Sequence, residues 1–186
     1  MKKITKEQAF EILEEYGTPP HVIRHCEAVS RVAYKVGLRL QEKGVNVDPE
    51  LAMIAGLLHD MARVHEDHQI VAADWLRERG YDELADIIAV HMTYSTFNDI
   101  DNSTETDLVC LGDRVCIEGK YVGIEKRFEY IINKAAKNAP QHIQFIRSKE
   151  YQMKSYIREL EKYIGITLDE LMSEDETTEK QENKND

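Results

Sequence analysis

The stretch PELAMIAGLLHDMAR, residues 49–63, decides the fold class. It starts with a proline at a first-turn position, and apolar side chains then recur at intervals of three and four: Leu51, Ala55, Leu58 and Ala62. This spacing is the period of an α-helix with one buried face, and proline is favoured in the first turn, where its missing N–H is not needed. We therefore expect a buried helix that ends near the polar pair His59-Asp60.

The same period recurs on both sides of this stretch. It predicts helices over residues 5–16, 20–43, 67–79, 82–92, 104–117 and 123–137, and a last helix after Pro140 that runs to Ile164. No window alternates long enough for a confident strand, and the chain has no Asn-Gly or Asp-Gly hairpin turn. With no internal repeat and no long linker, we predict an all-α protein with a single helical bundle domain over residues 1–168.

The last eighteen residues differ from the rest in charge. The chain holds 24 Lys and Arg against 35 Asp and Glu, a net charge of −11, and residues 169–186 carry eight of the acids but two of the bases. This segment has few apolar side chains to offset the entropy of ordering, so we predict an acidic, disordered tail. Residues 114–162 hold a local surplus of bases, which we interpret as a solvated helix face. An acidic chain argues against a nucleic-acid partner.

The cysteines and the hydropathy indicate where in the cell the protein is expected. Cys26, Cys110 and Cys116 form no Cys-x-x-Cys pair, so buried thiols are favoured over a disulfide framework or a zinc finger. The chain contains no run of about 18 uncharged apolar residues, so we expect no membrane partner and a cytoplasmic location.

Polar side chains lie on several of the apolar helix faces. His25, His59 and His91 are each on such a face, and Asp60 and Asp113 add two carboxylates. A lone buried histidine is usually a satisfied core residue, and a His-Asp dipeptide alone is a weak motif. An ionised carboxylate on an apolar face is costly unless it is paired or binds a cation. The set as a whole therefore favours a shared metal ion.

The order and context of these residues carry a family resemblance. His25 in RHCEAV, His59-Asp60 in AGLLHDMAR and Asp113 in LVCLGDRV resemble the His, His-Asp, Asp ligand set of the HD superfamily of metal-dependent phosphohydrolases. The resemblance covers roughly residues 20–130. Many family members have an apolar residue and a glycine after the His-Asp pair, and this chain has Met61-Ala62 there. This departure affects no ligand.

A second stretch extends the resemblance to two metal ions. Residues 67–93, DHQIVAADWLRERGYDELADIIAVHMT, look like the segment of family members that bind two metals, with His68 and His91 at the added ligand positions. Diadenosine tetraphosphate hydrolases and cyclic-dinucleotide phosphodiesterases of the family carry such ligands. The resemblance thus implies one or two divalent ions (Fe, Mn, Co, Ni, Zn or Mg), with Asp60 shared. The implied ligands are His25, His59, Asp60, His68, His91 and Asp113.

Two arginines flank these ligands. In the family, a basic residue after the His-Asp pair contacts substrate phosphate, and an arginine next to the first histidine often does the same. The resemblance gives these roles to Arg63 and Arg24, with a salt bridge to a nearby acid as the alternative. We expect surface or supporting roles for His21, His65 and His142.

The implied function is hydrolysis of a phosphate ester or anhydride of a small phosphorylated substrate, of the nucleotide or dinucleotide type. Metal-activated water would attack the phosphorus, and Asp60, Arg63 and Arg24 would form the catalytic set. Two alternatives stay open: an HD-fold di-iron oxygenase, because four histidines and two aspartates also suit such a site, and a non-catalytic nucleotide-binding module. The sequence leaves the exact substrate, the metal and the oligomeric state open.

Overall fold

The computed structural model describes residues 3–174 and divides the chain into two compact units, Met1–Val122 and Gly123–Asp186. Nearly all regular structure in the described residues is helical, which confirms the all-α prediction. The first unit ends at residue 122, inside the span 1–168 for which the sequence predicts one domain. Helical periodicity shows which face of a helix is buried but not which helix covers it, so the limits of these units leave no mark on the pattern. One domain over residues 1–168 stays a prediction.

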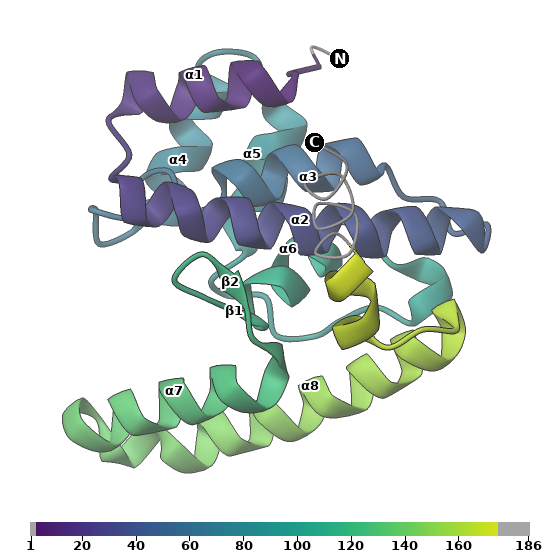
Figure 1. Ribbon diagram of the computed structural model, residues 1–186. Coiled ribbons are helices and arrows are strands. Elements are labelled where there is room, and N and C mark those ends of the chain that lie inside the picture. Colours follow the sequence, from purple (N-terminus) through teal and green to yellow (C-terminus); the bar gives the residue numbers. More distant parts are fainter. Residues whose placement is uncertain (1–2, 175–186) are drawn as a thin grey trace, which may run out of the picture. The chain divides into compact units, whose positions relative to one another are not determined.

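The first unit contains six α-helices, a 3-10 turn and a short hairpin (Figure 1). In order these are α1 (Lys6–Tyr16), α2 (Pro20–Glu42), α3 (Pro49–Leu58), α4 (His68–Arg77), α5 (Asp82–Val90), η1 (Ile100–Asn102), α6 (Glu105–Asp113), β1 (Cys116–Ile117) and β2 (Lys120–Tyr121).

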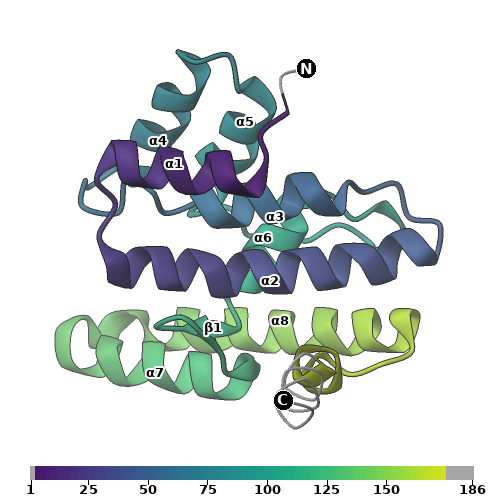
Figure 2. The ribbon, with the colours of Figure 1, turned by 45° about the horizontal axis from the view of Figure 1, so that its top comes forward.

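The long helix α2 forms the centre of this unit, with α3 and α6 packed along it (Figure 2). Two glycines allow close approach of the backbones. A Cβ at Gly56 would lie 2.9 Å from Ser30 Cα, and one at Gly112 would lie 2.8 Å from the Val29 carbonyl oxygen. Since real Cβ contacts are not that short, both helices lie on α2 at a distance that requires glycine.

Two short helices, α4 and α5, pack against each other, and α5 also contacts α3. They are joined by a turn at Gly80, whose φ of 78° is left-handed. Their starts and ends agree with the predicted helices to within two residues. As a result His68 is the first residue of α4, and His91 directly follows the end of α5.

The predicted helix over 104–117 is too long. Helix α6 ends at Asp113, and β1 and β2 form an antiparallel hairpin in which Cys116 pairs with Tyr121. The turn residues Glu118 and Gly119 both have positive φ, 47° and 87°, as a two-residue hairpin turn requires. The sequence has no window long enough for a confident strand, and this hairpin gives no such window because each strand has two residues and its turn is Glu-Gly rather than Asn-Gly.

The second unit contains α7 (Gly123–Asn138), η2 (Pro140–His142) and α8 (Ile143–Ile164), with α7 and α8 side by side as a hairpin (Figures 1 and 2). A further helical segment covers 168–174, in which Leu168 and Leu171 are buried. The predicted tail, 169–186, therefore begins inside a helix, and its remainder, 175–186, lies outside the described residues.

All three cysteines are buried free thiols, as the sequence predicted. Within residues 3–174, no helix has the length and apolar character needed to cross a bilayer.

Candidate metal centre

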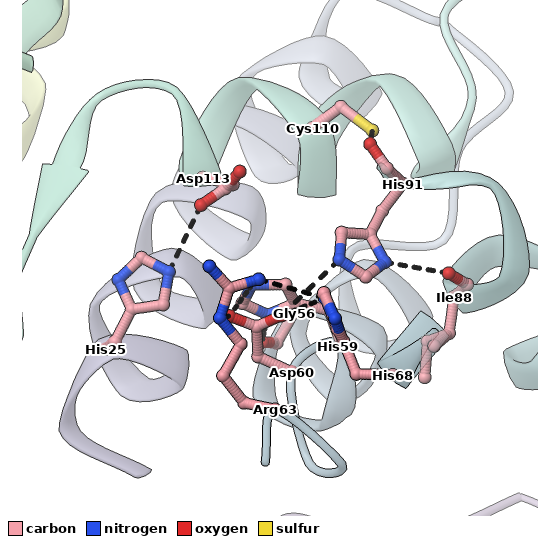
Figure 3. A network of polar contacts seen from close by, with 10 residues as sticks. All are labelled: His25, Gly56, His59, Asp60, Arg63, His68, Ile88, His91, Cys110 and Asp113. Atoms are coloured by element: carbon pink, nitrogen blue, oxygen red, sulfur yellow. Dashed lines mark hydrogen bonds and ion pairs between the residues drawn. The ribbon is translucent and has the colours of Figure 1, made fainter. Parts of the chain in front are cut away.

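The structure brings the six predicted ligand residues together from five helices of the first unit (Figure 3). His25 lies on α2, and Asp113 is the last residue of α6. His59 and Asp60 follow the end of α3, His68 opens α4, and His91 follows α5. Residues that are almost ninety positions apart in the chain thus meet at one place.

The side chains fall into two overlapping groups. In the first ligand group, His25, His59 and Asp60 each offer an atom within 4.8 Å of the others, and in the second ligand group Asp60, His68 and His91 do the same. Asp113 lies beside the first group, because its Oδ1 is 3.1 Å from His25 Nε2. The described chain therefore has a His/Asp cluster able to hold metal, with Asp60 common to both groups.

The two carboxylate oxygens of Asp60 face different histidines. Its Oδ1 lies 3.0 Å from His68 Nε2 and 3.4 Å from His91 Nε2. Its Oδ2 lies 3.7 Å from His59 Nε2. A carboxylate in this orientation can bridge two cations, with one oxygen directed to each.

Two histidine rings are oriented by the same backbone contact. His59 Nδ1 is 2.8 Å from the carbonyl oxygen of Gly56, and His91 Nδ1 is 2.8 Å from that of Ile88. A carbonyl oxygen can only accept, so Nδ1 carries the proton in both rings and Nε2 keeps its lone pair. Both histidines directly follow a helix, where the carbonyls of the last turn are open to side-chain donors. This contact fixes each ring so that Nε2 faces Asp60.

The facing atoms have no proton to share. His59 Nε2, Asp60 Oδ1 and His91 Nε2 are all buried, and none has a hydrogen-bond partner among the described residues. A lone pair opposite a carboxylate oxygen is unfavourable in a buried site, whereas imidazole nitrogens and carboxylate oxygens together suit a divalent cation. The residues present therefore fit a metal ion.

The protonation states suit the same ion. Burial lowers the pKa of His59 to about 4, although the nearby Asp60 carboxylate opposes this effect. Burial alone would raise the pKa of Asp60, but its neighbours, among them His68 and the Arg63 guanidinium, hold it well below its usual range. Near neutral pH the site therefore presents a neutral imidazole at His59 and an ionised carboxylate at Asp60, the forms that bind metal.

The two predicted arginines differ in position. Arg63 Nε is 3.6 Å from Asp60 Oδ2 and its Nη1 is 3.1 Å from His68 Nε2, while about half of its side chain (48%) is exposed. It therefore joins the cluster and still reaches solvent. Arg24 is exposed and is not part of the network in Figure 3; its Cβ lies under the hairpin turn at Gly119. His21, His65 and His142 are also exposed.

Several residues that support the cluster were not found from the sequence. The Thr18 hydroxyl donates to the Met61 carbonyl oxygen, at 2.9 Å, next to Asp60. Cys110 Sγ contacts the His91 carbonyl oxygen at 3.8 Å. Asp107 is fully buried beneath the loop that follows His91. The sequence offered one signal: Thr104-x-x-Asp107 has the spacing of a helix capping box, which the structure contains.

The fold and the cluster together define an all-α protein with a candidate metal centre. Residues 22–117, just over half of the chain, match the HD domain family. The chain therefore belongs to this family, the HD superfamily of metal-dependent phosphohydrolases. It is also similar to an uncharacterized protein of Methanocaldococcus jannaschii, with 42% identity over 86 residues, which cover 45% of this chain and 50% of that protein. The chain thus matches about half the length of this relative. No solved structure matches the chain.

Proposed function

We propose that this protein is a metal-dependent phosphohydrolase that cleaves a phosphate ester or anhydride of a nucleotide or dinucleotide. The observation that carries the proposal is the position of Asp60, whose two oxygens face two different sets of histidine nitrogens at 3.0–3.7 Å. Membership of the HD domain family supports hydrolysis as the reaction class.

The residues would divide between two ions. His25, His59, Asp60 and Asp113 would hold the first, and His68, His91 and the shared Asp60 the second. A bound divalent ion supplies Lewis acidity, which favours attack of water on phosphorus and offsets charge on the phosphoryl oxygens. Asp60 brings negative charge to both ions, and the Nδ1–H contacts of His59 and His91 hold their rings in place.

Arg63 would bind the substrate phosphate. Its guanidinium contacts the cluster at Asp60 and His68, and the exposed half of its side chain leaves donors free to face a ligand. A planar, permanently charged group of this kind is suited to phosphate oxygens and to charge that develops on them. Arg24 is the second candidate because it precedes His25 in α2 and is exposed. A nucleotide carries the negative charge that both arginines and both ions would attract.

A phosphate-release screen tests the proposal. Purified protein is incubated with nucleotides, dinucleotides and phosphomonoesters in the presence of Mn²⁺, Co²⁺, Fe²⁺ or Mg²⁺. Release of nucleotide products is measured beside release of phosphate, because cleavage of a dinucleotide into two nucleotides frees no inorganic phosphate. We expect metal-dependent release in the wild type and in His142→Ala, which changes an exposed histidine, and none in His59→Ala. Consumption of oxygen without phosphate release would contradict hydrolysis and favour the oxygenase alternative. Binding of nucleotides without turnover under every metal would favour the non-catalytic module.

A further inference from the structure

One face of α6 holds the segment that begins at His91. Asp107, Cys110 and Arg114 are spaced by three and four positions, so they share a face of this helix and its C-cap. Cys110 contacts the His91 carbonyl oxygen, and Arg114 Nη2 donates to the Tyr94 carbonyl oxygen. The guanidinium of Arg114 also lies 4.9 Å from the centre of the Phe97 ring.

The strongest contacts of this face belong to Asp107, which has no exposed surface. Its carboxylate accepts from the Tyr94 hydroxyl at 2.6 Å, from Asn98 N at 3.1 Å and Nδ2 at 2.8 Å, and from Thr104 N and Oγ1, both at 2.8 Å. A buried carboxylate with five donors is stable, and removal of one donor weakens the network that holds the loop to α6. Burial and the adjacent carboxylate raise the pKa of Tyr94, so its hydroxyl stays protonated and can donate.

These contacts bear on His91 because of where it lies. His91 follows the last turn of α5, a position at which helices fray, and one backbone carbonyl orients its ring. Its Nε2 lies 3.4 Å from Asp60 Oδ1. Helix α6 also carries Asp113, which contacts His25 beside the first ligand group. The same helix thus touches both ends of the cluster.

We infer that Asp107, together with Tyr94, Cys110 and Arg114, is a positioning unit that holds His91 at the distance the second ligand group needs. None of these residues is among the candidate ligands. Their effect is transmitted through the backbone from His91 to Asn98. The inference rests on the proposed function, since it assigns the second ion a support that the first ion does not share.

Titration of the metal-free protein with Mn²⁺ tests the inference. Tyr94→Phe removes one hydroxyl and keeps the ring, and Asp107→Asn removes the charge at the centre of the unit. We expect the second binding event to weaken by about tenfold or more, the usual effect of removing a contact that orients a ligand, while the first stays unchanged. The control is Thr5→Ala, which removes the cap of α1, a helix without a candidate ligand. It should lower stability and leave both events as in the wild type.

Wild-type affinities for both ions in Tyr94→Phe and Asp107→Asn would overturn the inference, as would an equal loss at both sites. A wild type that binds a single ion would instead contradict the dinuclear site of the proposed function.

Amide hydrogen exchange of the metal-free protein tests the positioning role without any bound ion. We expect Tyr94→Phe to speed exchange at three backbone N–H groups. Those of Asn98 and Thr104 donate to the Asp107 carboxylate, and that of position 94 donates to the Val90 carbonyl oxygen. Unchanged exchange there would overturn the inference. The exchange experiment uses Tyr94→Phe alone. The inference can therefore be tested even if Asp107→Asn does not fold.

Discussion

The two ligand groups are built in different ways. His25 and His59 of the first ligand group lie on α2 and at the end of α3, whose backbones approach closely at Gly56. His68 and His91 of the second ligand group stand at the ends of α4 and α5, helices of ten and nine residues. Close packing of α2 and α3 supports the first group, although His59 itself follows the end of α3, whereas both histidines of the second group stand at the ends of short helices. We therefore expect mutations to affect the two groups separately, except at Asp60.

Asp60→Asn should have the largest effect, because this residue belongs to both groups. Asparagine lacks the negative charge that both carboxylate oxygens share, and its NH2 group replaces one of these oxygens. One ion therefore loses a ligand, and the other keeps only a neutral oxygen. Loss of a contact that merely orients a ligand costs about 10–100-fold, so we expect activity and the affinity for both ions to fall by more than about 100-fold. Metal analysis after dialysis, together with the phosphate-release assay, measures both quantities.

Asp101→Asn is the control for this variant, since Asp101 is an exposed carboxylate in η1. It should keep full metal content. An Asp60→Asn protein that folds and retains either ion at wild-type affinity would contradict a shared ligand.

The next prediction separates the groups. His68→Ala should reduce the metal content from about two ions to about one, because the first ligand group is left intact. His25→Ala should leave the second group in place, so an ion held by Asp60, His68 and His91 should still bind. Metal analysis of both variants after loading with Mn²⁺ or Fe²⁺ measures the difference. If either variant loses both ions, the two groups form one site.

The sequence was sufficient for the parts that depend on local pattern. The apolar period predicted α1 to α5 closely. The resemblance to the HD family implied the ligand set, and the structure places these six side chains near one another. Their binding of metal stays a prediction. The first-turn proline and the apolar face of residues 49–63 correctly predicted a helix that ends at the His59-Asp60 pair.

The remainder depends on contacts between distant residues. The role of Gly56 requires Ser30 of another helix at 2.9 Å, and the role of Asp107 requires Tyr94 and Asn98 from a loop. Neither contact has a periodic signal. The hairpin after α6 was missed because its strands are too short to alternate. Arg24, assigned by resemblance, lies outside the drawn network, so its contact with phosphate stays a prediction.

Gly56→Ala tests whether close helix packing fixes the first group. The added Cβ would meet Ser30 backbone atoms at 2.9 and 3.1 Å, so α2 and α3 would have to separate. We expect the free energy of unfolding to fall by about 2 kcal/mol, as for overpacked cores. The affinity of the first ion should drop by about tenfold, and that of the second less, because Gly56 also carries the carbonyl that orients His59.

Gly37→Ala is the matched control in α2. Its Cβ would meet Leu108 Cδ1 and the Cα and Cβ of Pro49 at 3.2 Å, so these neighbours would have to move by a few tenths of an ångström, less than Ser30 would have to move in Gly56→Ala. Alanine is also favoured over glycine in a helix by about 1 kcal/mol, so we expect little net change in stability and none in metal affinity. Equal effects of the two variants on metal affinity would mean that Gly56 has no special role at the cluster. Chemical denaturation and Mn²⁺ titration supply the two measurements.

The smallest expected effect is a pH dependence of the free energy of unfolding, which arises from His59 alone. The pKa of His59 is about 4 in the folded, metal-free protein, below its ordinary value of 6.5, because burial disfavours the charged ring. The unfolded chain therefore binds a proton that the folded chain does not. This contribution to stability is complete above about pH 6.5 and is lost as the pH falls toward about 4.

Between about pH 7.5 and about pH 5.5 we expect the metal-free protein to lose about 1 kcal/mol of unfolding free energy from His59. Urea denaturation at both pH values measures this loss. His59→Gln should remove it, since glutamine does not titrate, whereas His142→Gln changes an exposed histidine and should keep it. A pH dependence that persists undiminished in His59→Gln would show that His59 is not held neutral by burial.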